Sequence, residues 1–322
     1  MRLTYASVLL LIELASPVLS FSPSRGLQNR MQLHALTERQ LQFWEDVEEG
    51  LVDIQSFYEK QGLDIDRIQQ FAKSCQSGTA PTPSVPGHEP SEEHVDGLTA
   101  QPFWDAASQP DLFPWAQQLE EQAQIIQDEF QEKLSEASMF QSDSVWQNQV
   151  MGEGWSAVRL QRLGVWNTDN CAKFPKTYQL LKALKIPLAV RGICFARQAP
   201  GSGVQPHSDG RNFILTSHLG LKIPDGCWIQ VGEERRGWEE GKLTTLDTSF
   251  THSTGNPTNE DRHVLIIDFW HPELTEAERK ALDFVYDLRN KFESGVVPVR
   301  KPRSLQEEEG GLAAWWSSVT GS

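Results

Sequence analysis

Residues 186–223 read IPLAVRGICFARQAPGSGVQPHSDGRNFILTSHLGLKI. Two apolar runs, 186–197 and 212–223, flank a stretch that is rich in Pro, Gly and polar residues. Short apolar runs bounded by turn residues are typical of strands in a β-sandwich or barrel. The pattern recurs downstream in CWIQVG (227–232), KLTTLD (242–247) and HVLIIDFW (263–270). The sequence therefore predicts a mainly β fold beyond about residue 150.

Helical periodicity lies on both sides of these strands. Residues 38–75 carry apolar side chains at three- and four-residue steps, which predicts a helical segment with one buried face. That face comprises Leu41, Trp44, Val47, Leu51 and Ile54.

A second helix is expected to begin near Asp111, with Pro114 in its first turn, where a missing N–H costs little. Its core-facing stripe comprises Trp115, Leu119, Ala123, Ile126, Phe130 and Leu134. A final helix is expected over about 275–293, because Thr275 and Glu278 have the spacing of a capping box.

Composition suggests where the folded domain begins and ends. Residues 76–100 are rich in Pro, Ser, Gly and Glu, which is typical of a linker. Residues 296–322 become polar and then small, and indicate a flexible tail. We therefore expect the main folded domain over residues 101–295.

The first 37 residues resemble a targeting presequence. Residues 1–20 have the basic start and apolar run of a signal peptide, with small residues suited to cleavage before Phe21. Glu13 interrupts the apolar run and excludes a membrane-spanning helix. Residues 15–37 lack acidic residues and contain Ser and Arg, as transit peptides do. Together they resemble the bipartite plastid presequence of algae with complex plastids, with an ordinary secretory signal as the alternative. We expect delivery to the secretory pathway (ER or secreted) or to a plastid, and no transmembrane segment in the mature chain.

Charge and cysteine content narrow the function classes. The net charge of −15 argues against a nucleic-acid partner, which would require a basic face. The four cysteines contain no CxxC pair, so a zinc ribbon or thioredoxin-like site is disfavoured. Cys194 and Cys227 lie in apolar segments and are expected to be small buried hydrophobes.

Two histidines and one aspartate in the β-rich half suggest a metal site. His207 and Asp209 occur in PHSDGRN, and His252 occurs in SFTHS after a strand-like run. Two imidazoles and one carboxylate are the ligand set that holds Fe(II) on one face and leaves the other face open. Arg262, on the following strand, could bind a dicarboxylate co-substrate. This set predicts a 2-oxoglutarate-dependent oxygenase.

The flanking sequence makes the prediction more specific. From Trp155 to Leu274 the chain contains WSAVRLQR, NCAKFPKT, APGSGVQPHSDGRN, HLGLKIP, CWIQVG, WEEGK, DTSFTHS and DFWHPEL. In this order, the pieces resemble the catalytic core of the aspartyl/asparaginyl β-hydroxylase family of Fe(II)/2-oxoglutarate-dependent dioxygenases. The resemblance implies a double-stranded β-helix, a cupin-like jelly roll, with flanking helices.

The resemblance also implies Fe(II), 2-oxoglutarate and O2 as requirements. It assigns His207 and His252 as metal ligands and Arg262 as the 2-oxoglutarate arginine. His218, in HLGL, matches a histidine near the co-substrate, although a packed strand histidine is the alternative. Asp209 would complete the metal set and the catalytic centre. Trp155 and Trp228 are candidates for cavity walls.

This chain and members of the family differ at three positions. Some members lack the carboxylate that Asp209 supplies. Animal members carry an arginine two positions before the HLGL histidine, where this chain has Thr216. The cysteine pair of animal members is incomplete, because Cys171 is present but Tyr178 takes the second place. We therefore expect the chelating end of the co-substrate, or a substrate carboxylate, to be held differently here.

The expected activity is hydroxylation of a C–H bond in an aspartyl or asparaginyl residue of a protein or peptide. Hydroxylation of a free amino acid such as proline, or of a lipid acyl chain, is the alternative within this chemistry. A non-catalytic cupin-like binding module is the alternative of a different class, and the intact ligand set with Arg262 argues against it. A zinc hydrolase is disfavoured, because the histidines have no HExxH motif or neighbouring glutamate.

Overall fold

The computed structural model describes residues 38–134 and 154–294. These residues belong to one compact unit, Leu33–Ser322. The expected presequence (1–37) and tail (296–322) lie outside the described residues and stay predictions. None of the described helices combines the length and the apolar character that crossing a bilayer requires.

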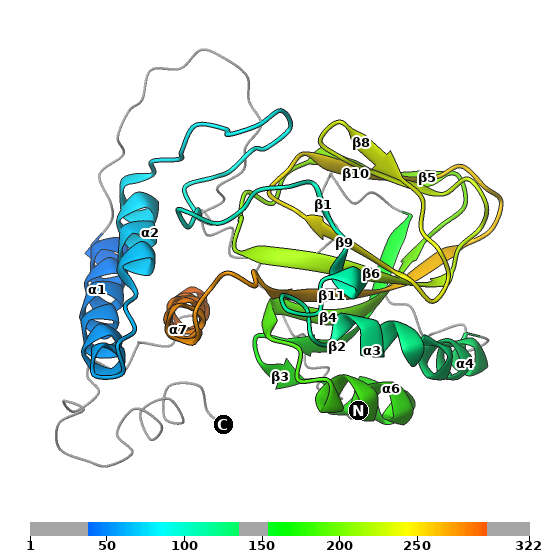
Figure 1. Cartoon of the computed structure of the whole chain (residues 1–322), viewed down its shortest axis with the longest axis horizontal. Helices are drawn as coiled ribbons and strands as arrows, with labels where there is room; N and C mark the ends of the chain where they lie inside the picture. Colours follow the sequence, from blue (N-terminus) through cyan, green and yellow to red (C-terminus); the bar gives the residue numbers. More distant parts are fainter. Residues whose placement is uncertain (1–37, 135–153, 295–322) are drawn as a thin grey trace, which may run out of the picture. The chain divides into compact units, whose positions relative to one another are not determined.

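The described strands form two antiparallel sheets (Figure 1). The larger sheet has the strand order β1-β9-β6-β11-β4-β2-β3 and the smaller has β5-β10-β7-β8. The strands of the larger sheet, in chain order, are β1 (Phe103–Trp104), β2 (Trp155–Arg162), β3 (Val165–Trp166), β4 (Leu188–Gln198), β6 (Ile214–Lys222), β9 (Leu243–Asp247) and β11 (Arg262–Trp270). Those of the smaller sheet are β5 (Ser202–His207), β7 (Trp228–Val231), β8 (Glu234–Arg236) and β10 (His252–Asn256).

From β4 onward the chain passes back and forth between the sheets. β4, β6, β9 and β11 lie in the larger sheet, whereas β5, β7, β8 and β10 lie in the smaller. Alternation of this kind rolls two sheets against each other into a jelly roll, with an apolar layer between their facing sides. That layer includes Cys194, Ala196, Ile229 and Val264. The prediction of a mainly β, double-stranded β-helix fold is confirmed.

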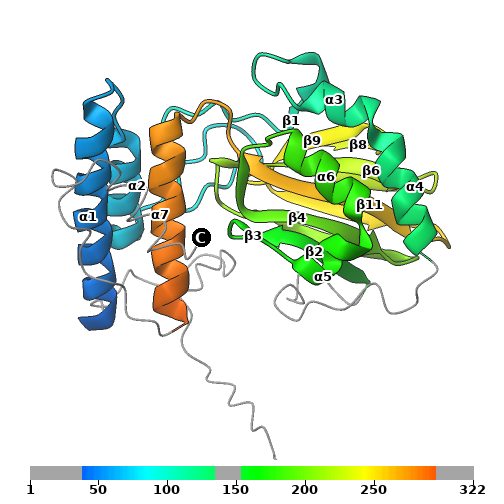
Figure 2. The ribbon, with the colours of Figure 1, turned by 90° about the horizontal axis from the view of Figure 1, so that it is seen from below.

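Helices cover the outer face of the larger sheet (Figure 2). Leu119, Ile126 and Phe130 pack there against sheet residues such as Phe195 and Leu265. The helical elements of this layer are η1 (Ala106–Ser108), α3 (Ala116–Glu121), α4 (Ala123–Lys133), α5 (Thr168–Lys173) and α6 (Pro175–Ala183).

The prediction of one continuous helix from Asp111 is wrong about where the helix begins and about its continuity. Turns occupy the residues around Pro114, and they bury Phe113 against Phe269. The helix begins only at Ala116, and Gln122, with φ −105° and ψ 7°, separates α3 from α4. The expected apolar stripe nevertheless faces the core, with Leu134 half-buried at its end.

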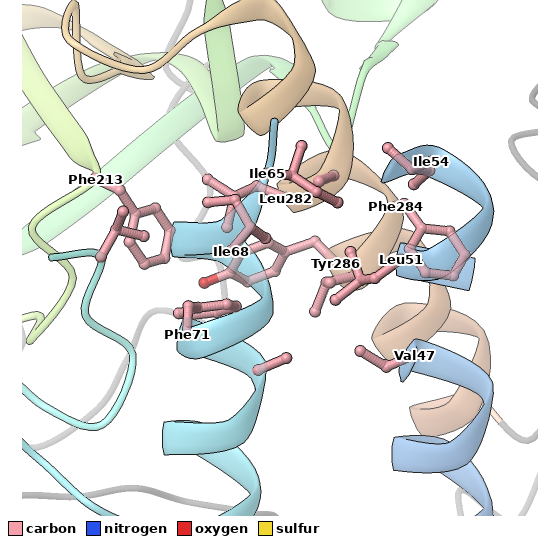
Figure 3. Close-up of a cluster of buried hydrophobic side chains, with 14 of the residues drawn as sticks. Val47, Leu51, Ile54, Ile65, Ile68, Phe71, Phe213, Leu282, Phe284 and Tyr286 are labelled. Atoms are coloured by element: carbon pink, nitrogen blue, oxygen red, sulfur yellow. The ribbon is translucent and has the colours of Figure 1, made fainter. Parts of the chain in front are cut away.

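Three further helices pack together beside the sheets: α1 (Glu38–Glu59), α2 (Asp66–Ser77) and α7 (Glu276–Glu293). Figure 3 shows side chains from all three helices converging with Phe213 of the sheet region. The predicted apolar face of α1 is buried except at Leu41, which is 46% exposed. The predicted capping box of α7 is present, because Thr275 and Glu278 each accept a hydrogen bond from the other's backbone N–H.

The segment 76–100, expected to be a linker, has an irregular backbone but extensive contacts. Gly87 accepts a hydrogen bond from the Thr251 N–H at 2.6 Å, and the Ser91 N–H donates to the Gly210 carbonyl at 2.9 Å. Composition does not reveal these contacts, because Pro, Gly and Ser suit both free linkers and tightly held turns. Residues 85–98, hereafter the 85–98 segment, thus lie against the loops that follow β5 and precede β10.

The close approach of the 85–98 segment to the turn at Gly232 requires a glycine at position 87. Gly87 has φ +78°, and a Cβ there would lie 2.6 Å from the Gly232 Cα. Gly78 has φ +65°, but a Cβ added there would have no neighbouring atom within 4 Å, so it is a matched control. We expect Gly78→Ala to lower the free energy of unfolding by about 1–2 kcal/mol through its left-handed backbone. Gly87→Ala should cost a further ~1–3 kcal/mol through the clash.

Urea unfolding of the two variants measures the difference. Equal losses in both would contradict the close packing of the 85–98 segment against the turn at Gly232.

Candidate metal centre

His207 and His252 face each other across the pairing of β5 with β10. His207 ends β5, His252 begins β10, and the two are direct partners in the register. Their ring centroids are 4.2 Å apart. Asp209 lies two residues beyond His207, and one ligand atom from each of the three residues falls within 4.8 Å of the others. The structure therefore brings together the three residues predicted as metal ligands.

Both rings have the tautomer that a metal needs. His207 Nδ1 donates to the Gln205 carbonyl at 2.8 Å, and His252 Nδ1 donates to the Phe250 carbonyl at 2.9 Å. A carbonyl can only accept, so each Nδ1 carries the proton and each Nε2 keeps its lone pair. Burial, above all, lowers the pKa of His252 to about 4, which keeps this ring neutral at physiological pH.

The two oxygens of Asp209 have different neighbours. Oδ1 lies 3.9 Å from His207 Nε2, whereas Oδ2 accepts a hydrogen bond from Arg191 Nη1. Burial raises the pKa of Asp209, but Arg191 and the two histidines lower it by more than burial raises it. The net shift of this pKa is therefore downward. The carboxylate is therefore ionised and can act as a hard oxygen donor.

The backbone holds both ligand loops in place. The Asp209 N–H donates to the Thr248 carbonyl at 2.8 Å. The Ser208 hydroxyl lies within hydrogen-bond distance of the carbonyls of Ser249 (2.8 Å) and Glu89 (2.9 Å). The last of these belongs to the 85–98 segment, so three separate stretches of chain fix the positions of the ligands.

One cavity connects the three ligands to Arg262 and His218. Its apolar wall includes Trp155, as expected. Trp228 does not line it, because its ring lies over Gly255 and beneath the Arg235 guanidinium at 4.0 Å. The remaining apolar lining consists of Cys194, Val204, Ile229, Leu246 and Ile266.

Arg262 is a buried cation without a counterion among the described residues. It is 2% exposed, donates to Gln198 Oε1 and stacks on Trp238 at 4.4 Å, while its Nε has no hydrogen-bond partner. Burial lowers its pKa to about 10. An unpaired buried charge is costly, and a carboxylate in the cavity would offset that cost.

His218 contacts Trp238, the ring on which Arg262 stacks. The Trp238 indole N–H donates to His218 Nδ1 at 3.2 Å, which leaves the ring proton on Nε2. Burial, followed by the charge of Arg262, lowers the pKa of His218 to about 3. His218 is thus a neutral hydrogen-bond donor that lines the cavity.

Comparisons with known proteins agree with this geometry. Residues 120–272 match the family model for aspartyl/asparaginyl beta-hydroxylase. This part of the chain matches the aspartyl/asparaginyl β-hydroxylase family. The resemblance stated from the motifs is therefore confirmed.

Curated relatives share the same region. Human aspartate beta-hydroxylase domain-containing protein 2 is 34% identical over 175 residues, which cover 52% of this chain and 47% of that protein. Mouse aspartyl/asparaginyl beta-hydroxylase is 34% identical over 193 residues, which cover 59% of this chain and 26% of that protein. The chain thus spans half or less of the length of these relatives.

Solved structures overlap with part of the chain. A Pseudomonas putida prolyl-4-hydroxylase is 16% identical, covers 46% of this chain and 86% of its own, and has a TM-score of 0.31. The assignment of the fold depends on the strand order of this chain and not on that overlap.

The structure adds three residues to which the sequence motifs assign no role. Arg191, Thr248 and Asp268 line the same cavity. Arg191 Nη2 lies 3.2 Å from the Thr216 hydroxyl, so a guanidinium occupies the neighbourhood where animal family members carry an arginine on the other strand. For Arg191, the signal in the sequence is a charge in the middle of the apolar run 186–197, which also ends on Arg197.

The four cysteines form no disulfide. All four are free and buried, as expected for Cys194 and Cys227. Tyr178, at the second position of the cysteine pair in animal members, packs on Trp166 with ring centroids 4.9 Å apart.

Removal of Asp209 tests the ligand set. Asp209→Ala should lower Co(II) affinity by at least ten- to a hundredfold, since loss of even an outer-shell group costs roughly that much. His207→Ala and His252→Ala should be at least as damaging. Asp261→Ala is the matched control, because Asp261 is ion-paired with Arg197 at 2.9 Å and lies outside the cavity.

Titration with Co(II) under anaerobic conditions measures these affinities. Near-normal affinity in Asp209→Ala would show that the aspartate is not a ligand.

Proposed function

We propose that this domain is an Fe(II)- and 2-oxoglutarate-dependent hydroxylase. The observation that carries the proposal is one cavity with three metal donors at one side and an unpaired, buried arginine at another. The donors fit Fe(II), because they combine two neutral imidazoles with one carboxylate. Arg262 fits the distal carboxylate of a dicarboxylate, because its planar fork has no anionic partner of its own among the described residues.

Each group would have a defined task. His207, Asp209 and His252 would hold the iron, which together with 2-oxoglutarate and O2 supplies the oxidation of a C–H bond to C–OH, with succinate and CO2 as co-products. Arg262 would bind and orient the co-substrate. His218 would donate its Nε2 proton in a hydrogen bond to a co-substrate oxygen. The apolar wall would exclude water from the reacting groups.

We infer that the substrate is an aspartyl or asparaginyl residue of a protein or peptide. The family name and the names of the relatives support this choice. A free amino acid such as proline, or a lipid acyl chain, is the alternative within the same chemistry. A substrate screen that reads succinate release distinguishes them, with peptides, free amino acids and acyl substrates compared at equal concentration. Binding of metal and 2-oxoglutarate without substrate-dependent succinate release would support a binding module instead.

Arg262→Ala tests the co-substrate assignment. Loss of a buried charge-assisted contact should weaken 2-oxoglutarate binding by about 2–5 kcal/mol, while Co(II) affinity should change little. Arg197→Ala, on the neighbouring strand and half-exposed, is the control. Anaerobic calorimetry with Co(II)-loaded protein gives the affinity.

Arg262→Lys keeps the charge and serves as a second variant should the alanine variant fold poorly. An unchanged 2-oxoglutarate titration in a folded Arg262→Ala protein would exclude this arginine as the anchor.

A further inference from the structure

Arg191 points into the metal cavity against the alternation of its own strand. In β4, Ile193 and Phe195 face the helical layer, whereas Cys194 and Ala196 face the smaller sheet. Side chains alternate along a regular strand, so residue 191 would share the face of residues 193 and 195. Arg191 instead lines the cavity together with Cys194.

A glycine bulge produces this change of face. Gly192 has φ +72°, and a Cβ there would lie 2.3 Å from the backbone carbonyl oxygen of Gln161. The register slips on both sides of β4 at this point, in the pairing with β11 and in the pairing with β2. Bulges often lie beside active sites, where they redirect a side chain. The strand thus departs from regular pairing where it delivers a guanidinium to the cavity.

The guanidinium meets two carboxylates and two hydroxyls. Nη1 donates to Asp209 Oδ2, and Nη2 lies 3.2 Å from Asp268 Oδ1, from Thr216 Oγ1 and from Thr248 Oγ1. Asp268 is held in turn by the Thr216 hydroxyl at 2.5 Å. The Arg191 side chain is 13% exposed, so these contacts are largely shielded from water.

These contacts give the two oxygens of Asp209 different partners. Oδ2 is occupied by Arg191, while Oδ1 lies on the side of His207 Nε2. A carboxylate that binds through both oxygens takes two positions around a metal, and a carboxylate that binds through one oxygen takes one. A chelating co-substrate needs two open positions, and O2 needs a third.

We propose that Arg191 is a positioning residue that restricts Asp209 to one metal-binding oxygen and so keeps a coordination position open for the co-substrate. This inference rests on the proposed function. The competing explanation is that Arg191 only neutralises two buried carboxylates. The two explanations differ in what happens to metal and co-substrate binding when the guanidinium is removed.

Arg191→Met is the informative change. Loss of the cation frees Oδ2 and removes a positive charge near the metal, so Co(II) should bind at least as tightly as in the wild type. The visible absorption of bound Co(II) should change, because the number of ligand atoms changes. Affinity for 2-oxoglutarate should fall, because a second bound oxygen of Asp209 would take a position that the co-substrate needs. We expect a loss of roughly ten- to a hundredfold, the scale on which outer-shell changes alter the activity of metal sites.

Two control variants separate positioning from stability. Arg289→Met removes a similar arginine, 15% exposed and paired with Glu93 at 2.7 Å, outside the cavity. It should lower the melting temperature, whereas the spectrum of the Co(II) that it binds should match the wild type, because Asp209 keeps its contact with Arg191. Asp268→Asn removes the other carboxylate of Arg191 but leaves the contact with Asp209, so its Co(II) spectrum should match the wild type.

A folded Arg191→Met protein with the wild-type Co(II) spectrum and wild-type 2-oxoglutarate affinity would overturn the inference. Loss of Co(II) binding in step with melting temperature would also overturn it, in favour of a structural role. If Arg191→Met does not fold, Arg191→Lys and Arg191→Gln are compared by the same measurements: the lysine should keep the wild-type spectrum and the glutamine should lose it. A wild-type protein that binds neither Co(II) nor 2-oxoglutarate would instead exclude the proposed function itself.

Discussion

The antiparallel pairing of β5 with β10 is the constraint on which the site depends. It places His207 opposite His252, and each histidine stands at the end of its strand, where the backbone turns away. A shift of one residue in this register would send one imidazole to the other face of the sheet. The ladder fixes the spacing of the two rings, and the loops that leave it bring Asp209 and Thr248 together through a backbone hydrogen bond.

The placement of the strands and loops around this pairing also determines how charge is distributed in the cavity. Of the three arginines that line the cavity, Arg191 and Arg262 have different surroundings. Arg191 is matched by Asp209 and Asp268, whereas Arg262 has only the amide oxygen of Gln198 and the ring of Trp238. An anion that enters therefore gains most at Arg262, where it removes the cost of an uncompensated charge. The cavity thus directs an anion to Arg262 rather than to Arg191.

Much of this arrangement is predictable from local patterns. Alternation and turn residues indicate the strands, the capping box marks the start of α7, and the joint occurrence of His207, Asp209 and His252 indicates the metal set. The strands and the helix cap are determined by near neighbours in the sequence, which a pattern can capture. The break at Gln122 is not predictable in the same way, because the apolar stripe continues across it.

The missed features depend on contacts between distant segments. Nothing in the alternation of β4 predicts that Arg191 faces the cavity, since a bulge at Gly192 reverses the face. The 85–98 segment has linker composition, yet Asn212 makes two hydrogen bonds to the backbone of Val95, one through Oδ1 and one through Nδ2. Such pairings are set by tertiary packing, which overrides local composition.

The 85–98 segment also joins α7 to the ligand loops. Glu93, buried within it, accepts from Arg211 beside the metal loop and from Tyr286 and Arg289 of α7. Metal binding at the candidate site and the docking of α7 would therefore be linked equilibria, because loosening the helix withdraws the partners of the loops that carry the candidate ligands. The smallest unit able to hold a metal there would thus extend well upstream of residue 120, where the family model begins to match.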